Sequence, residues 1–475
     1  MSIAAVEQAS QFPAGVLAEL RSLLGDRVVM SRAIREQHSR GEGRPLSALP
    51  DVVVYPETNE EVAAIAKRCY DNYIPIIPFG TGTSLEGHVA ALEGGVCIDL
   101  TRMNRVLSAS PEALDCRVQA GVTRKQLNAE IRSLGLYFPV DPGADASLGG
   151  MAATRASGTT AVRYGTMREN VLGLTVITPD GRIVRTGGRA RKSSAGLDLT
   201  RLYVGSEGTL GIITEIQLRL YGLPEAVTAA ICAFPDLASA IATSTAVLQS
   251  GAPIARMEFL NAEQMRASIK YSKLEDLEEK PTLFFEFHGT AKAVEEQVEL
   301  LQALSAEFGG GNFQFANRPE DRLKLWQARH DVYQSDLACV PNGVMVCTDA
   351  CVPISELVPC ILETEEDVAK SGVFAPIVGH VGDGNFHVNI VYDSGDDAQR
   401  VRAEELGHRV SLRAIRFGGT CSGEHGIGMH KIESLELEHG EAVEVMKTIK
   451  MALDPRGIMN PGKMLRLPDR ARFAS

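Results

Sequence analysis

One short segment constrains the fold more than any other: Gly379–Asn389 reads G-H-V-G-D-G-N-F-H-V-N. Its Asp383-Gly384 dipeptide, flanked by alternating apolar residues, is a strong signal for a two-residue β-hairpin turn. A turn at that position pairs His380 directly with His387. Directly opposed residues of an antiparallel pair have Cβ atoms roughly 4.5–5.5 Å apart. The segment therefore predicts a hairpin whose two imidazoles, on one face, can share a divalent metal ion.

A second segment, Cys421–Gly428, reads C-S-G-E-H-G-I-G and supplies further polar groups. Glu424 adds a carboxylate to the two histidines, which gives a two-His, one-carboxylate set with open positions for a substrate. The neighbouring His425 is free to transfer a proton, and Asn389 points to the same side of its strand as His387. A structural interpretation stays open, because two histidines in a hairpin are more often a surface or core pair than a metal site.

Length and charge narrow the class of protein. A chain of 475 residues is long enough for about two or three domains. The formal net charge of −12 argues against a protein that binds nucleic acid or an anionic membrane. Nine cysteines without regular spacing indicate reduced thiols and a cytoplasmic location. No run of about eighteen apolar residues and no signal peptide is visible.

The first half of the chain alternates predicted helices and strands. Helices are predicted over 12–24, over 59–72 behind a Thr58/Glu61 capping box, and over 123–134 before Gly135. Strands are predicted at 52–56, 74–79, 96–100, 115–120 and 173–178, and the polar segment 32–49 predicts a loop. This alternation indicates an α/β or α+β class.

Three glycine-rich stretches lie in this half: 80–88, 141–158 and 205–214. Glycines and small hydroxylated residues at this density let backbone N–H groups approach a phosphate closely. Three such stretches indicate a large, multi-phosphate or dinucleotide ligand, with tight turns as the alternative. After Gly80-Thr81-Gly82 the third glycine of the Rossmann fingerprint is missing, which disfavours a nicotinamide cofactor on a doubly wound sheet.

Beyond residues 221–224 the pattern changes to a second domain, a sheet covered by helices. Helices are predicted at 235–249, 291–307 and 318–334, and strands at 255–260, 283–288, 312–316 and 344–353. The third helix carries Trp326, which we expect in the core, and Arg329, for which a surface position is the alternative. The C-terminal stretch 453–465 is punctuated by prolines and glycines.

Four motifs, spread from Asp51 to Lys463, carry a family resemblance: P-F-G-T-G-T-S-L-E-G-H, G-H-V-G-D-G-N-F-H-V-N, S-G-E-H-G-I-G and N-P-G-K. In combination they resemble flavin-binding oxidoreductases of the vanillyl-alcohol oxidase/p-cresol methylhydroxylase fold. Within that superfamily the chain is similar to the FAD-linked D-lactate dehydrogenase (cytochrome) family, near the glycolate oxidase catalytic subunit and D-2-hydroxyglutarate dehydrogenase.

The resemblance implies an α+β fold in three stretches of chain. Residues 1–223 form a two-subdomain FAD-binding domain with its core at about 47–223. Residues 224–430 form an α+β substrate and metal-binding cap domain with an antiparallel sheet. Residues 431–475 form a C-terminal segment that returns to the FAD-binding domain.

The resemblance also implies that FAD binds to the glycine-rich loops, non-covalently, because no attachment residue is recognisable. The pyrophosphate is expected on Gly80–Ser84, the adenine half near Gly208 and Ile213, and the isoalloxazine near Asn460. The full expected cofactor set is Pro78, Gly80, Thr81, Gly82, Thr83, Ser84, Gly87, His88, Pro142, Gly143, Leu148, Gly149, Gly150, Ala153, Ser157, Gly158, Tyr164, Gly165, Glu207, Gly208, Gly211, Ile213 and Asn460.

In the second domain the resemblance implies one divalent ion, zinc or manganese, on His380, His387 and Glu424. It makes His425 the catalytic base, which removes the hydroxyl proton while a hydride passes to the flavin. Arg329 is the expected clamp for the substrate carboxylate, with Asn389 and Thr348 as further substrate contacts.

One departure bears on the substrate. The hydroxyglutarate enzymes carry a lysine for the distal carboxylate where this chain has Cys347-Thr348, with no Lys or Arg between Val340 and Val352. An unpaired second carboxylate would be costly to desolvate. The resemblance therefore implies monocarboxylic substrates, with D-lactate first and longer D-2-hydroxy acids and glycolate behind.

Several alternatives stay open from sequence. The electron acceptor is a quinone, cytochrome c or an electron-transfer flavoprotein. Four other identities compete with this one. Two are related enzymes, a glycolate oxidase subunit that needs partner chains and a D-2-hydroxyglutarate dehydrogenase. The other two are a non-catalytic flavin- or metal-binding protein and a metal-dependent hydrolase without flavin. No nucleic-acid partner or transmembrane segment is expected. A homodimer and peripheral contact with the inner face of the membrane remain open.

Overall fold

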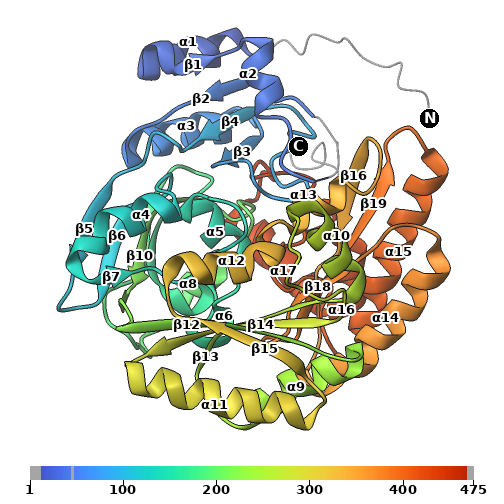
Figure 1. The fold of residues 1–475 in the computed structure, drawn as a ribbon. Coiled ribbons are helices and arrows are strands. Elements are labelled where there is room, and N and C mark those ends of the chain that lie inside the picture. Colours follow the sequence, from blue (N-terminus) through green and yellow to red (C-terminus); the bar gives the residue numbers. More distant parts are fainter. Residues whose placement is uncertain (1–11, 44–47, 468–475) are drawn as a thin grey trace.

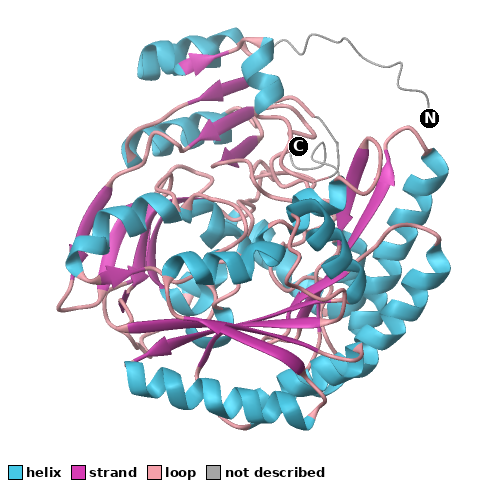
Figure 2. Ribbon diagram, viewed as in Figure 1, coloured by secondary structure: helices cyan, strands magenta, loops and turns pink. Residues whose placement is uncertain are grey.

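The computed structural model describes residues 12–43 and 48–467 (Figure 1). These residues form a four-stranded, a five-stranded and a two-stranded sheet in the N-terminal half and one large antiparallel sheet in the second half. Helices and largely antiparallel sheets alternate along the chain (Figure 2), and the expected α+β class is confirmed. No helix in these two described ranges has the length and apolar character needed to cross a bilayer.

The first sheet of the N-terminal half has the order β1-β2-β4-β3, in which β4 runs parallel to both β2 and β3. The second is antiparallel, with the order β5-β6-β10-β8-β9. A short pair joins β7 to β11. The strands are β1 Val28–Val29, β2 Val52–Val54, β3 Ile76–Phe79, β4 Val96–Asp99, β5 Val106–Ser110, β6 Asp115–Gln119, β7 Leu136–Tyr137, β8 Val171–Ile177, β9 Ile183–Gly187, β10 Ile212–Arg219 and β11 Tyr221–Gly222.

Eight α-helices accompany these strands in the described part of the N-terminal half, together with 3-10 turns at Gly25–Arg27 and Arg132–Leu134. Thr58 caps α3, since its side chain accepts a hydrogen bond from Glu61 N. The Glu61 carboxylate accepts from Glu57 N, so the expected capping box is only half formed. The helices are α1 Ala14–Leu24, α2 Arg32–Gln37, α3 Asn59–Asp71, α4 Arg124–Ile131, α5 Leu148–Thr154, α6 Ala161–Tyr164, α7 Met167–Asn170 and α8 Leu199–Tyr203.

The large sheet has the strand order β15-β12-β14-β13-β18-β19-β16, and β17 also pairs with β19. Its strands are β12 Ala226–Ala233, β13 Ile254–Leu260, β14 Thr282–Gly289, β15 Gly311–Ala316, β16 Gly343–Cys347, β17 Ala350–Cys351, β18 Ile377–His380 and β19 Asn385–Asp393. The helices of this half are α9 Leu237–Gln249, α10 Ala262–Ser272, α11 Ala291–Glu307, α12 Pro319–His330, α13 Val332–Leu337, α14 Leu357–Ser371, α15 Asp397–Arg416, α16 Ile432–His439 and α17 Ala442–Leu453, with a 3-10 turn at Ile354–Glu356.

Side-chain alternation along β14 assigns the two faces of this sheet. Phe285 and Phe287 enter a core shared with α9, α11, α14 and α15, which cover the outer face in Figure 1. Phe284 points the other way and packs against Trp326 of α12. Successive side chains of a strand face opposite sides, so one strand serves both cores. Trp326 is buried, as expected.

The hairpin register differs from the expected one. His380 lies opposite Asn385, and His387 lies opposite Val378. The connection is the four-residue segment 381–384 rather than a two-residue Asp-Gly turn. Packing against the neighbouring segment explains the difference: Val352 N donates to Gly384 O at 3.0 Å, and a Cβ on Gly384 would lie 2.2 Å from Val352 O. The two histidines are diagonal neighbours on one face, not a directly opposed pair.

Two other expectations need correction. The segment 32–49, expected to be a loop, contains α2, while residues 44–47 of that segment lie outside the described residues. The single helix expected over 318–334 is two helices, because Asp331 (φ −89°, ψ 5°) leaves the helical conformation between α12 and α13.

The C-terminal segment lies beside β3. Met459 forms a parallel bridge with Ile76, and Ile76 N donates to Ile458 O at 2.8 Å. Ile458 and Met459 belong to the same buried cluster as the two N-terminal sheets.

The sheet core yields a stability prediction. Replacing Phe285, which is fully buried, with alanine should lower the free energy of unfolding by about 3–5 kcal/mol. Replacing Phe315, on the edge strand of the same sheet and 57 % exposed, should cost less than about 0.5 kcal/mol. Urea titrations followed by circular dichroism measure both, and equal losses would contradict this packing.

Candidate active site

A cavity of about 1530 Å³ joins the glycine-rich loops to the hairpin histidines. Ordinary small-molecule pockets are about 300–1000 Å³, so this volume suits a dinucleotide together with a substrate. One wall consists of residues from all three glycine-rich stretches, and the other comes from α12, β16, β18, β19 and the Cys421–Gly428 segment. The two sequence features that indicated a dinucleotide and a metal ion thus share one space.

Most residues expected at the cofactor line this cavity. Those that do are Pro78, Gly80, Thr81, Gly82, Thr83, Ser84, His88, Pro142, Gly143, Gly149, Gly150, Ala153, Ser157, Gly158, Glu207, Gly208, Gly211, Ile213 and Asn460. Four expected residues are not among the lining residues: Gly87, Leu148, Tyr164 and Gly165. Leu148 is buried in the N-terminal core, Gly87 packs against Met429, and the Tyr164 hydroxyl hydrogen-bonds His288 Nδ1 at 2.8 Å.

Two glycines of the first loop meet different requirements. Gly82 has φ +71°, a conformation that side chains disfavour, and a Cβ there would approach Phe79 to 2.8 Å. A Cβ on Gly80 would lie 2.3 Å from Ser147 Oγ. At these two positions of the loop there is therefore room for backbone only.

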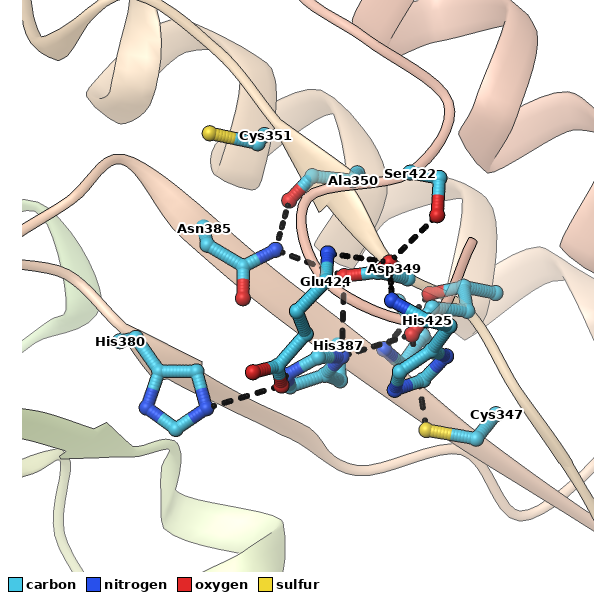
Figure 3. Close-up of polar contacts among 12 residues, drawn as sticks. Cys347, Asp349, Ala350, Cys351, His380, Asn385, His387, Ser422, Glu424 and His425 are labelled. Atoms are coloured by element: carbon cyan, nitrogen blue, oxygen red, sulfur yellow. Dashed lines mark hydrogen bonds and ion pairs between the residues drawn. The ribbon is translucent and has the colours of Figure 1, made fainter. Parts of the chain in front are cut away.

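His380, His387 and Glu424 converge in the cap half of the cavity. The Nε2 atoms of His380 and His387 lie 3.2 Å and 3.3 Å from the same Glu424 oxygen, Oε1. The two rings are edge to face with centroids 5.3 Å apart. Figure 3 shows the Glu424 carboxylate between the two imidazoles. The structure thus brings together all three expected ligands.

The second nitrogen of each imidazole has a fixed partner. His380 Nδ1 lies 2.7 Å from Glu258 Oε1, and His387 Nδ1 lies 2.8 Å from the Thr348 carbonyl oxygen. Both partners are acceptors, so both Nδ1 atoms donate. Burial disfavours a charge on His380, but Glu258 and Glu424 outweigh it and raise its pKa to about 10.

Arg329, which is partly exposed, forms an ion pair with the buried Glu258 beside this cluster. Arg329 contacts Glu258 Oε2 through Nε at 2.9 Å and Nη2 at 2.8 Å. Glu258 is fully buried in β13. Burial opposes its ionisation, yet His380 and Arg329 hold its pKa below the usual range. Arg329 also lines the cavity, so it is not a surface charge.

His425 stacks on His387, with ring centroids 5.1 Å apart and planes within 10°. Its Nδ1 lies 3.7 Å from Glu86 Oε1 and has no hydrogen-bond partner among the described residues. Lys431 Nζ lies 3.0 Å from the same Glu86 oxygen. Burial works against ionised Glu86, but Lys431 and His425 keep its pKa below the usual range.

The two further expected substrate contacts line the cavity but are engaged by the protein. Asn389 Nδ2 donates to Asp336 at 2.8 Å, and its Oδ1 accepts from the Cys347 thiol at 3.2 Å. Thr348 Oγ1 accepts from Val388 N at 2.8 Å.

Sequence reasoning missed three buried carboxylates at this site: Glu258, Asp349 and Glu86. Each stands in an apolar or glycine-rich context, as in the strand I-A-R-M-E-F-L of β13. A buried carboxylate needs a charged or hydrogen-bonding partner. A single glutamate in an otherwise apolar strand could therefore have indicated a functional residue.

Comparisons with known proteins place both halves of the chain in FAD-linked families. Residues 50–187 match the family described as FAD binding domain, and residues 223–464 match FAD linked oxidases, C-terminal domain. A probable mitochondrial D-lactate dehydrogenase of Danio rerio is 51% identical, over 95% of this chain and 92% of that protein. The mitochondrial D-lactate dehydrogenase (cytochrome) of Arabidopsis thaliana is 43% identical, over 96% and 81%. A glycolate oxidase subunit of Bacillus subtilis is 33% identical, over 90% and 92%.

Solved structures agree on the fold. p-Cresol methylhydroxylase superposes with a TM-score of 0.78 at 18% identity, over 96% of this chain and 97% of that one. An alkyldihydroxyacetonephosphate synthase superposes with a TM-score of 0.75 at 20% identity, over 96% and 87%. The fold is therefore of the vanillyl-alcohol oxidase/p-cresol methylhydroxylase type.

Fold, cavity and family matches together define the class, an FAD-binding oxidoreductase. Within that class the chain belongs to the FAD-linked D-lactate dehydrogenase (cytochrome) family.

The glycine loop yields a prediction for the cofactor. Gly82→Ala should weaken FAD binding by about tenfold, because an alanine at φ +71° costs roughly 1–2 kcal/mol and its Cβ would meet Phe79. Gly222→Ala, with no atom within 4 Å of the added Cβ, is the matched control. Titration of the apoprotein with FAD, followed by flavin fluorescence, measures both affinities. Equal affinities in the two variants would contradict this assignment of the loop.

Proposed function

We propose that the protein oxidises D-2-hydroxy acids, with D-lactate as the preferred substrate and pyruvate as the product. The observation that carries the proposal is the convergence of His380, His387, Glu424 and His425, with Arg329, in the cavity that the glycine-rich loops line. Relatives named D-lactate dehydrogenase, up to 51% identical, support the same choice.

We further propose that His380, His387 and Glu424 hold one divalent ion, zinc or manganese. Both Nδ1 atoms donate elsewhere, so the Nε2 atoms are the ones that face the shared Glu424 oxygen. Without a cation an Nε2 proton bridges the imidazole and the carboxylate, in keeping with the raised pKa of His380. A divalent ion would take the place of these protons, because histidine binds a metal ion in its neutral form. Two ligands about 2.1 Å from a tetrahedral ion are about 3.4 Å apart, close to the 3.2 Å and 3.3 Å between each Nε2 and Glu424 Oε1. Among the described residues His380 is in no group of three or more residues whose ligand atoms all lie within 4.8 Å of one another, so the two imidazoles would move closer together when the ion binds. Metal-binding histidines usually donate their second N–H to a carboxylate or carbonyl.

Asp349 is not proposed as a ligand. Its donor atoms cluster with those of His387, Glu424 and His425 within 4.8 Å. However, its Oδ2 already accepts from the backbone nitrogens of Glu424 and His425, and its Oδ1 accepts from Asn385 Nδ2.

When bound, FAD supplies the acceptor for two electrons, and a divalent ion supplies a Lewis acid that lowers the pKa of a hydroxyl. His425 is the proposed base for the hydroxyl proton, since the residue lines the cavity and Glu86, 3.7 Å from its Nδ1, would stabilise the resulting imidazolium. Arg329 orients the substrate, because its contacts with Glu258 use Nε and Nη2 and leave Nη1 to donate to a carboxylate.

A quinone or cytochrome c is the proposed final electron acceptor, by analogy with relatives named D-lactate dehydrogenase (cytochrome). The glycolate oxidase subunit at 33% identity keeps glycolate oxidation as the second candidate. The two candidate functions predict different behaviour of the purified chain: a D-lactate dehydrogenase is active alone, whereas a glycolate oxidase subunit needs partner chains.

Anaerobic mixing with substrate tests the proposal. D-Lactate should bleach the flavin absorbance of the purified protein, L-lactate should not, and prior treatment with a chelator should prevent bleaching. His425→Ala should slow flavin reduction by about 10²–10⁴-fold, the usual contribution of a general base. His439→Ala, at a histidine whose side chain is 41% exposed, is the control. Bleaching by L-lactate would refute the proposed preference for the D-enantiomer. Full activity after metal removal would refute the proposed metal ion.

Substrate length gives a separate prediction. D-Lactate should exceed D-2-hydroxyglutarate in kcat/KM by at least about tenfold, because a second carboxylate would lack a charged partner beside Cys347. Cys347→Lys should raise kcat/KM for D-2-hydroxyglutarate, whereas Cys339→Lys, at an exposed cysteine, should leave it unchanged. A wild-type preference for D-2-hydroxyglutarate would overturn the interpretation of this position.

A further inference from the structure

The loop that carries Glu424 and His425 is held by two buried carboxylates from different halves of the molecule. Asp349 follows β16 in the cap and is fully buried, and Glu207 lies in the third glycine-rich stretch and is 5% exposed. Together they accept hydrogen bonds from four of the five backbone N–H groups between Glu424 and Gly428.

Asp349 holds the first part of the loop. Its Oδ2 accepts from Ser422 Oγ at 2.8 Å, Glu424 N at 2.9 Å and His425 N at 2.7 Å (Figure 3). A carboxylate that accepts several N–H groups at once forms strong, charge-assisted hydrogen bonds. Asp349 therefore fixes the backbone of the proposed base and of the proposed metal ligand within the cap.

Glu207 holds the second part from the other half of the molecule. Its Oε1 accepts from Ile427 N at 2.7 Å, and its Oε2 accepts from Gly428 N at 2.8 Å. A Cβ on Gly426, which has φ +83°, would lie 2.7 Å from Glu207 Oε1. The G-E-H-G-I-G sequence thus lets the loop close onto this carboxylate.

The backbone of Glu207 lies at the side of the cavity that the glycine-rich stretches line. Its backbone N donates to Ala153 O at 2.8 Å, and the next residue, Gly208, lines the cavity. Asn460 Nδ2 donates to the Glu207 carbonyl at 2.8 Å and to the His88 carbonyl at 3.1 Å. His88 Nε2 lies 3.1 Å from Glu207 Oε2. His88, Glu207 and Asn460, all expected at the cofactor, therefore contact one another, and the Glu207 carboxylate also binds the His425 loop.

We propose that Glu207 and Asp349 are positioning residues that set His425 relative to the bound flavin. Asp349 fixes the loop to the cap, and Glu207 fixes the same loop to the backbone that lines the cofactor cavity. The inference rests on the proposed role of His425 as the base. Neither carboxylate needs to contact the substrate for this purpose, since both act through the backbone of the loop.

Glu207→Gln is the direct test, because a glutamine can accept from one of the two N–H groups but turns its own NH2 toward the other. With FAD bound, the variant should reduce its flavin with D-lactate about 10- to 100-fold more slowly, with KM little changed. In a His425→Ala background the same change should alter the rate by less than about twofold, since the group being positioned is gone.

Amide hydrogen exchange provides a measurement that does not depend on turnover. In the wild-type holoprotein the peptide 422–428 should be protected, and Glu207→Gln should speed its exchange. Asp115→Asn is the matched control: Asp115 is a buried carboxylate on β6 paired with Arg189, and its loss should leave both the exchange and the rate of flavin reduction unchanged.

Three results would overturn the inference: unchanged exchange of 422–428 in Glu207→Gln, a wild-type rate in that variant, or an equal fold loss in the His425→Ala background. If the wild-type flavin were not reduced by any D-2-hydroxy acid, the proposed function would fall, and with it the role assigned to His425. The exchange result would then show separately whether the Glu207 contact exists in solution.

Discussion

The buried carboxylate of Glu258 is the interaction on which the site depends. A fully buried charge is tolerated only when it is paired and hydrogen-bonded, and here one carboxylate binds both Arg329 and His380. It therefore fixes the proposed substrate clamp relative to the first proposed metal ligand. The position of Glu258 follows from its strand: β13 lies between β14 and β18 in the sheet, so the glutamate is held beside His380 by backbone pairing rather than by a flexible loop.

The two sides of the cavity differ in whether backbone or side chains face the ligand. On the cofactor side the wall is mainly glycine and small residues, which leave backbone groups to face the ligand. The cap side combines apolar residues such as Trp326 and Val346 with histidines and charged groups, which are carried by strands, by α12 and by one tightly held loop. Oxidoreductases that use a cofactor need this arrangement, because the cofactor carries the redox chemistry and the protein supplies orientation and electrostatics.

Sequence reasoning predicted the motifs well but not their mutual contacts. Helix α11 has the predicted bounds, since an amphipathic segment between clear turns is determined locally. The predicted hairpin register was wrong, because β17 and Val352, which are far from the turn in sequence, determine the observed register. His380, His387, Glu424 and His425 were found because glycines and histidines stand out in a motif. Glu258, Asp349 and Glu86 were missed, since a single carboxylate shows its role only through long-range partners. For the same reason the sequence predicts Glu207 only as a cofactor residue: the residue lines the cavity, but the contact of its carboxylate with the His425 loop has no sequence signal.

The position of residues 458–460 beside β3 has a consequence for biogenesis. The first sheet obtains its last hydrogen-bonding partner from a segment made some 380 residues after β3 itself (Ile76 to Met459). Domains generally fold as units, N-terminal ones first, during synthesis. Here all strands of the large sheet in the cap are synthesised before the segment that completes the packing of the N-terminal core. The N-terminal core therefore gains these contacts only once residues 458–460 have been synthesised, and a cofactor cavity whose lining includes Asn460 has its full set of lining residues only then.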